Sequence, residues 1–199
     1  LKYSLPFIPN QLSWWVIGVS DRTIISWFLN VAENGIYSVA NKFSSIYITF
    51  YNIFNLSWTE SVSLHINDDD AKEFLSTTIN TLFSLFFSVC VGIIAYMPFV
   101  FQLLINEKYN KAYNQVPILM LAVLFQVIVG LYSVIYVALK KSTEIAKTSF
   151  WAAVINIGVD VLLIKFIGLY AASISTLIAY ATMTIYRYFH IRKYIVIPV

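Results

Sequence analysis

Apolar residues run along this chain in six long stretches, separated by short segments of polar and helix-breaking residues. The stretches span about residues 5–29, 35–64, 74–105, 113–139, 145–167 and 170–190, with connections at 30–34, 65–73, 106–111, 140–144 and 168–169. Each stretch is as long as the roughly 20 residues that a helix needs to cross a bilayer. The pattern therefore predicts an all-α, polytopic membrane protein with six transmembrane helices.

Prolines indicate where these helices begin or bend. Pro6 and Pro9 lie in the first turns of the first stretch, and Pro117 lies near the start of the fourth, where a missing N–H costs little. Pro98 lies inside the third stretch, so we expect it to kink or end that helix.

Composition agrees with a membrane location. Hydrophobic residues make up 59% of the 199 positions and charged residues 12%, whereas soluble domains are about half apolar and a quarter charged. The net charge is only +3 and no basic run is present, so no nucleic-acid partner is expected. The single cysteine, Cys90, has no intrachain disulfide partner and is expected to pack as a small apolar residue.

Six crossings place both termini on one side of the membrane, and the basic residues indicate which side. The terminal side carries eight Lys or Arg residues and the other side three, so the positive-inside rule predicts cytoplasmic termini. The acidic run 68–70 is then a solvated cytoplasmic turn that caps the third helix. The eight are Lys2, Lys72, Lys140, Lys141, Lys147, Arg187, Arg192 and Lys193, and the three are Lys108, Lys111 and Lys165.

Polar side chains form lines along three of the predicted helices. The longest line runs the full length of the second helix and favours a wet cavity wall. The shorter lines on the third and sixth helices are explained at least as well by close helix packing, because small polar residues bond between helices. The three lines are Ser38, Asn41, Ser45, Thr49, Asn52, Asn55 and Thr59, then Thr77, Asn80, Ser84 and Ser88, and finally Ser173, Thr176, Tyr180 and Thr184.

Charged residues inside apolar stretches usually face a partner, a cavity or an ion path, because a charge within the bilayer costs at least a few kcal/mol. If the first turn is centred near residue 32, Asp21 and Lys42 lie at similar depth. They then form a structural ion pair, or Arg22 and Lys42 present positive charge to an anionic substrate such as a phosphate. In the second case Asn41 and Asn52 of the polar line join the substrate site.

A second charged site is predicted between the fifth and sixth helices. Asp160 and Thr176 lie eight residues on either side of Gly168, and Asn156 lies one helical turn before Asp160. These oxygen-bearing side chains suit a hard monovalent cation. Alternatively, the buried aspartate takes up a proton, or the three residues form a hydrogen-bonded network that only joins the two helices.

At these residues the chain resembles the second half of a bacterial polysaccharide flippase of the multidrug/oligosaccharidyl-lipid/polysaccharide exporter superfamily. The resemblance covers essentially the whole chain, through the order and spacing of several loose motifs. They are Leu5–Asn10, Ser20–Arg22, Gly35–Lys42, Asn156–Ile164 and Ile167–Ala172.

The resemblance implies that residues 1–199 form the C-terminal six-helix lobe of a two-lobe transporter in the bacterial cytoplasmic membrane. Such transporters flip undecaprenyl-pyrophosphate-linked oligosaccharides by alternating access, so the expected partners are this substrate, membrane lipids and an N-terminal six-helix lobe. Related lipid II flippases hold a sodium ion at positions that match Asp21, Asn156, Asp160 and Thr176. The resemblance therefore implies a Na+ or proton coupling site at these residues, with a backbone carbonyl near Ala172 as a further ligand.

Two other functions remain open at this stage. A drug or cation exporter of the same superfamily would have no need for the cationic pair Arg22 and Lys42. A membrane-embedded glycan polymerase or ligase needs a large outer loop or a catalytic cluster, whereas the predicted outer connections are short. We therefore expect a transporter and no enzyme.

Overall fold

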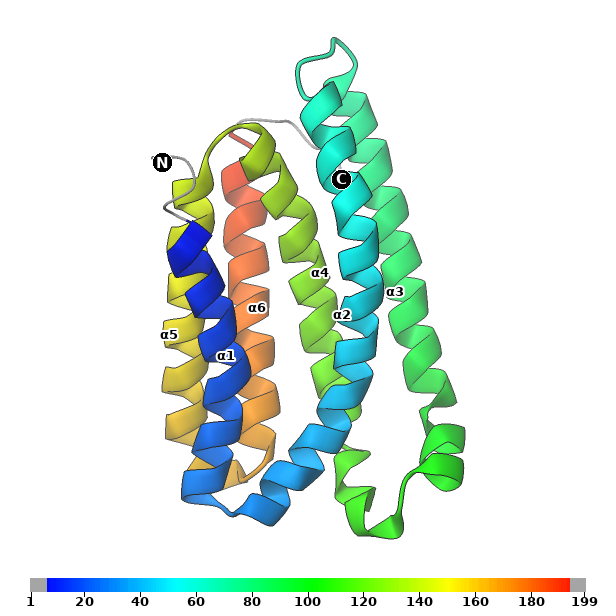
Figure 1. Ribbon diagram of the computed structural model, residues 1–199, viewed down its shortest axis with the longest axis vertical. Coiled ribbons are helices and arrows are strands. Elements are labelled where there is room, and N and C mark those ends of the chain that lie inside the picture. Colours follow the sequence, from blue (N-terminus) through cyan, green and yellow to red (C-terminus); the bar gives the residue numbers. More distant parts are fainter. Residues whose placement is uncertain (1–6, 194–199) are drawn as a thin grey trace.

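The computed structural model describes residues 7–193, and their regular structure is entirely helical (Figure 1). The predicted all-α fold is confirmed, while Pro6 lies outside the described residues. The helices are α1 (Phe7–Phe28), α2 (Val31–His65), α3 (Ala71–Leu104), α4 (Val116–Ala138), α5 (Ser142–Ile167) and α6 (Tyr170–Ile191), with a short 3-10 helix, η1 (Glu107–Ala112), before α4.

The predicted connection at 30–34 is too long, because a polar residue there begins a helix instead of interrupting one. The side chain of Asn30 accepts a hydrogen bond of 2.8 Å from the backbone N–H of Glu33, so α2 begins at Val31 and only Leu29 and Asn30 connect it to α1. The predicted connection at 106–111 does lie between α3 and α4; it contains η1, and α4 begins at Val116 instead of at residue 113.

The remaining helix-end predictions have mixed outcomes. Pro9 and Pro117 lie in the first turns of α1 and α4, as predicted. Pro98 does not end its helix, because α3 continues to Leu104. Asp70 directly precedes α3, but its side chain makes no capping hydrogen bond, so the capping role predicted for the acidic run is wrong.

The helices pack as two groups joined by α4. Helices α1, α5 and α6 pack closely together, α4 packs against α6 on one side and α2 on the other, and α3 lies at the outer edge (Figure 1). Cys90 of α3 is buried, with its thiol 3.6 Å from the carbonyl of Met120, as expected for a packed small side chain.

Three helices, α3, α4 and α5, are long and apolar enough to cross a membrane. In α3 the most apolar 18-residue window has a mean hydropathy of 2.1, yet only 17% of its residues are buried inside the helix bundle. Such a large exposed apolar surface needs lipid or another protein to cover it. The fold therefore agrees with a membrane protein.

The close approach of α2 and α4 depends on Gly130. A Cβ atom at this position would overlap the ring and hydroxyl of Tyr51, which donates a 2.8 Å hydrogen bond to Asn55. We expect Gly130→Ala to push the two helices apart and lower the free energy of unfolding by about 1–3 kcal/mol. Thermal unfolding of the purified protein in detergent measures this. Gly158→Ala is the matched control, because nothing lies within 4 Å of that position, and equal effects of the two variants would contradict the prediction.

Candidate functional site

Asp21 is the centre of a buried polar cluster to which four helices contribute. Its Oδ2 accepts hydrogen bonds from the hydroxyl of Tyr37 on α2 at 2.6 Å and from the hydroxyl of Thr176 on α6 at 2.9 Å. Its Oδ1 accepts one from the amide of Asn156 on α5 at 3.2 Å. The carboxylate of α1 thus joins three other helices through charge-assisted hydrogen bonds, which are stronger than neutral ones.

The short connection between α1 and α2 explains why Asp21 meets Tyr37. Asp21 lies eight residues before Leu29 and Tyr37 seven residues after Asn30, so the two lie at similar depth. The predicted turn centre near residue 32 had paired Asp21 with Lys42. That ion pair is not formed: within residues 7–193 the ion pairs are Glu33–Lys111 and Glu144–Lys147.

Asn156 is the second centre of the cluster. It is fully buried, its Oδ1 accepts a hydrogen bond of 3.1 Å from Ser20, and its Nδ2 lies 3.1 Å from the Thr176 hydroxyl and 3.3 Å from that of Ser175. The Thr176 hydroxyl also lies 3.0 Å from the backbone carbonyl of Ala172. Three of the four residues predicted to form the coupling site therefore share one hydrogen-bonded network.

Asp160, the fourth predicted residue, lies outside this network. It is fully buried one helical turn beyond Asn156, and neither of its carboxylate oxygens has a hydrogen-bond partner within the described part of the chain. It is close enough to Asp21 for the two negative charges to repel one another. Burying a carboxylate without donors is very unfavourable unless a cation or a proton neutralises it.

The chemistry of the cluster favours a hard cation or a proton over a transition metal. Carboxylate, amide, hydroxyl and carbonyl oxygens are the ligands that hard cations prefer. In residues 7–193, no group of three or more His, Cys, Asp or Glu side chains is arranged so that it could hold a metal ion. The cluster therefore has neither the sulfur nor the imidazole ligands that are typical of zinc or copper.

A hollow of ≈ 270 Å³ lies directly beside Asp21. Thr176 and Tyr37 of the cluster line it, together with the aromatic side chains of Trp14 and Tyr180. Asn41, predicted to contact substrate, lines the same hollow. A ligand or water in this space can therefore reach the carboxylate.

The other residues predicted to bind substrate lie on the surface of the helix bundle. Arg22, Lys42 and Asn52 are exposed, and neither cation forms an ion pair with another described residue. The polar line of α2 is exposed or half-buried along its length. Its hydroxyls include Ser45 and Thr49, which bond to carbonyls of their own helix.

The two shorter polar lines differ from each other. The line on α3 is exposed throughout. The line on α6 is buried between helices, where Ser173 donates a 2.6 Å hydrogen bond to Gln115 and Thr184 one of 3.2 Å to the carbonyl of Phe125. On α6, polar side chains therefore hold helices together.

Arg187 is an important residue that the sequence reasoning counted only among the basic residues of the cytoplasmic side and did not predict to be part of the packed interior. The structure buries it completely between α4, α5 and α6. Its Nη1 donates to the carbonyl of Val129 at 3.1 Å and to Ser133, and its Nε and Nη2 donate to Thr148 at 3.1 and 2.7 Å. The sequence does contain an indication of this burial, because Arg187 follows Thr184 by three residues and so continues the polar line of α6.

The comparisons with known proteins add no further evidence. Searches of protein-family models, curated proteins and solved structures found no match to this chain.

Proposed function

We propose that this chain is a lobe of six transmembrane helices in a bacterial flippase of the cytoplasmic membrane. The flippase moves undecaprenyl-pyrophosphate-linked oligosaccharides from the cytoplasmic to the outer leaflet, and a second six-helix lobe completes its central cavity. Both termini of the lobe are cytoplasmic. Transport is coupled to Na+ or protons, and the chain is not an enzyme.

The observation that carries this proposal is the uncovered polar line of α2, which Lys42 borders. Arg22 and Lys42 are exposed on a lobe whose remaining surface is rich in apolar side chains, and neither has an acidic partner among the described residues. A pyrophosphate crosses a bilayer only if fixed charges and polar groups replace its water. Arginine and lysine are the side chains that do this for phosphates.

The buried cluster supports coupling of this transport to an ion. Asp21 bonds side chains of α2, α5 and α6, so neutralising it changes the attraction between these helices. A cation or proton can drive a transport cycle only if it binds one arrangement of the helices better than another. A charge site shared by four helices meets this condition, because movement of any one of them alters the ligand set.

Arg22→Ala and Lys42→Ala test the substrate role. We expect each variant to abolish complementation of a flippase-deficient strain while its membrane expression stays normal, because the pyrophosphate loses a cationic partner. Lys72→Ala, which removes another exposed cation at the start of α3, is the matched control and should complement fully. Normal complementation by both Arg22→Ala and Lys42→Ala would contradict the proposed substrate contact.

A second candidate function rests on the hollow beside Asp21. Trp14, Tyr37 and Tyr180 surround a carboxylate there, and aromatic faces with a negative charge also suit an organic cation. A drug exporter would lose ethidium efflux in Asp21→Asn and keep it in Arg22→Ala. This function is favoured over the flippase if the wild-type protein exports ethidium and if cells that lack the protein still export glycan normally.

A further inference from the structure

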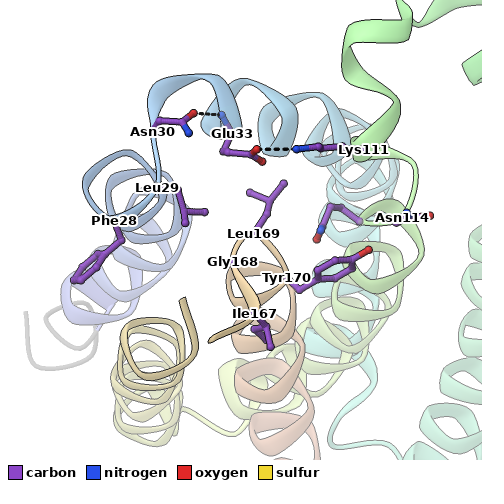
Figure 2. A pocket seen from close by; sticks show the side chains of 11 residues that line it. Phe28, Leu29, Asn30, Glu33, Lys111, Asn114, Ile167, Gly168, Leu169 and Tyr170 are labelled. Carbon is purple, nitrogen blue, oxygen red and sulfur yellow. Dashed lines mark hydrogen bonds and ion pairs between the residues drawn. The ribbon is translucent and has the colours of Figure 1, made fainter. Parts of the chain in front are cut away.

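A second hollow, of ≈ 650 Å³, lies at the end of the bundle where three helices begin (Figure 2). Helices α2, α4 and α6 start around it, and α1 and α5 end there. This end of the bundle is opposite to the end where α1 begins and α6 ends (Figure 1). In the proposed orientation this is the outer side. The hollow is separate from the one beside Asp21, because the two have no lining residue in common.

The lining of this outer hollow carries no net charge. Its acidic residue, Glu33, and its basic residue, Lys111, form an ion pair with 3.2 Å between Oε1 and Nζ, which bridges the rim in Figure 2. The pair satisfies the charges of both side chains. The lining therefore favours an uncharged ligand over an anion or a cation.

Polar groups in the lining are left free to bind a ligand. Gln115 is only 2% exposed, and its Oε1 accepts a 2.6 Å hydrogen bond from Ser173, while its Nε2 has no partner among residues 7–193. Asn114 is exposed, and its side chain makes no hydrogen bond within the same residues. A side-chain amide both donates and accepts hydrogen bonds, as do the hydroxyl groups of a sugar.

An aromatic face completes the site. Tyr170, at the start of α6, is 38% exposed and projects toward Asn114 in Figure 2. A half-exposed tyrosine offers an apolar face beside a polar hydroxyl. The C–H faces of a pyranose ring fit such a surface, while its hydroxyls meet the amides.

We propose that the outer hollow binds uncharged sugar units. Its volume is within the range of roughly 300–1,000 Å³ that is usual for small-ligand sites, and its neutral, amide-rich and aromatic lining matches a polyhydroxyl ligand. The source of the sugar rests on the proposed function: it is the oligosaccharide head of the flipped lipid, held at the outer side before release.

Photocrosslinking in living cells tests this site with the full protein and its native substrate. A photoreactive benzoylphenylalanine replaces Asn114 in the outer hollow, Asn41 in the hollow beside Asp21, or Val31 as the control. Val31 lies at the same end of the bundle and is 78% exposed, but it does not line the outer hollow. The readout is a glycan-bearing adduct of the protein, detected by gel shift and by its loss after glycosidase treatment.

We expect adducts at positions 114 and 41 and none at position 31. An adduct at 41 without one at 114 overturns the outer sugar site and leaves the flippase function intact, whereas absence of both contradicts the flippase function and with it this site. An adduct at 114 alone supports the site and argues against passage beside Asp21. Equal adduct yields at positions 114 and 31 overturn the site, because they show that the glycan contacts the whole outer end of the bundle.

A second variant separates binding from mere proximity. Tyr170→Ala should lower the yield of adduct at position 114 by about two- to tenfold, because it removes the aromatic face. The yield at position 41 should stay unchanged. An unchanged yield at 114 in a protein that expresses normally would overturn the role of Tyr170 and the sugar site.

Discussion

Arg187→Ala is expected to lower the free energy of unfolding by about 3–5 kcal/mol, because it opens a large cavity and removes charged hydrogen-bond donors. The side chain is fully buried and its guanidinium group bonds residues of both α4 and α5. Through Ser149, which lies 3.5 Å from Nη2 and donates a 2.6 Å hydrogen bond to Asn10, it is also linked to α1. Loss of this group therefore loosens the contacts among all four helices.

Thermal unfolding in detergent measures the effect, with Arg192→Ala as the control. Arg192 is exposed and packs over the ring of Tyr188, so its loss should change stability by less than about 1 kcal/mol. Arg187→Met fills most of the volume of the arginine side chain but lacks its hydrogen-bond donors. It should therefore lower the free energy of unfolding by less than Arg187→Ala does. If Arg187→Ala is no less stable than Arg192→Ala, Arg187 does not hold the helices together.

Asp160→Asn is expected to remove the dependence of stability on Na+ without destabilising the ion-free protein. The carboxylate is buried with neither oxygen partnered within residues 7–193, so a neutral amide of the same shape relieves the cost of its charge. In the wild type, Na+ at about 100 times its dissociation constant should stabilise the fold by about 2.7 kcal/mol. The shift is measured as the difference in melting temperature between NaCl and choline chloride.

The control for this experiment is Asp69→Asn, which changes an exposed carboxylate in the connection before α3 and should keep the full Na+ shift. An Asp160→Asn protein that keeps the shift would contradict the assignment of Asp160 to the cation site. A wild type that responds to pH and not to Na+ would show that the coupling ion is a proton.

The register between helices is where sequence reasoning and structure differ most. The length of the apolar stretches predicts the long helices well, because an apolar stretch of about 20 residues has few other stable forms in a bilayer. The ends of the helices are harder to predict. Asn30, for example, is equally typical of a turn and of a helix N-cap. Since Asn30 caps α2, the connection shortens and Asp21 meets Tyr37 where the sequence had suggested Lys42.

Burial of individual charges also depends on tertiary contacts. In the sequence, Arg187 is one of several basic residues near the cytoplasmic end of the last predicted helix, yet it is enclosed by hydroxyls and carbonyls from α4 and α5. The reverse holds for Arg22 and Lys42, which lie within helices and are exposed on the surface of the bundle. The position of a residue in the sequence gives its place along its helix. Only the packing of the helices decides whether a neighbouring helix covers the face on which that residue lies.

The sequence alone determined that this protein is all-α and strongly apolar, with rare charges set inside its helices, because hydropathy and helix length follow directly from residue order. Its spacing also placed Asn156, Asp160 and Thr176 in one candidate site, to which the resemblance to flippases added Asp21. The tertiary structure decided that Asp21, Asn156 and Thr176 are bonded to one another while Asp160 stands buried without a partner in residues 7–193. The physical reason is that a hydrogen bond between helices forms only if the donor–acceptor distance is right to within a few tenths of an ångström, and the packing of the helices sets that distance.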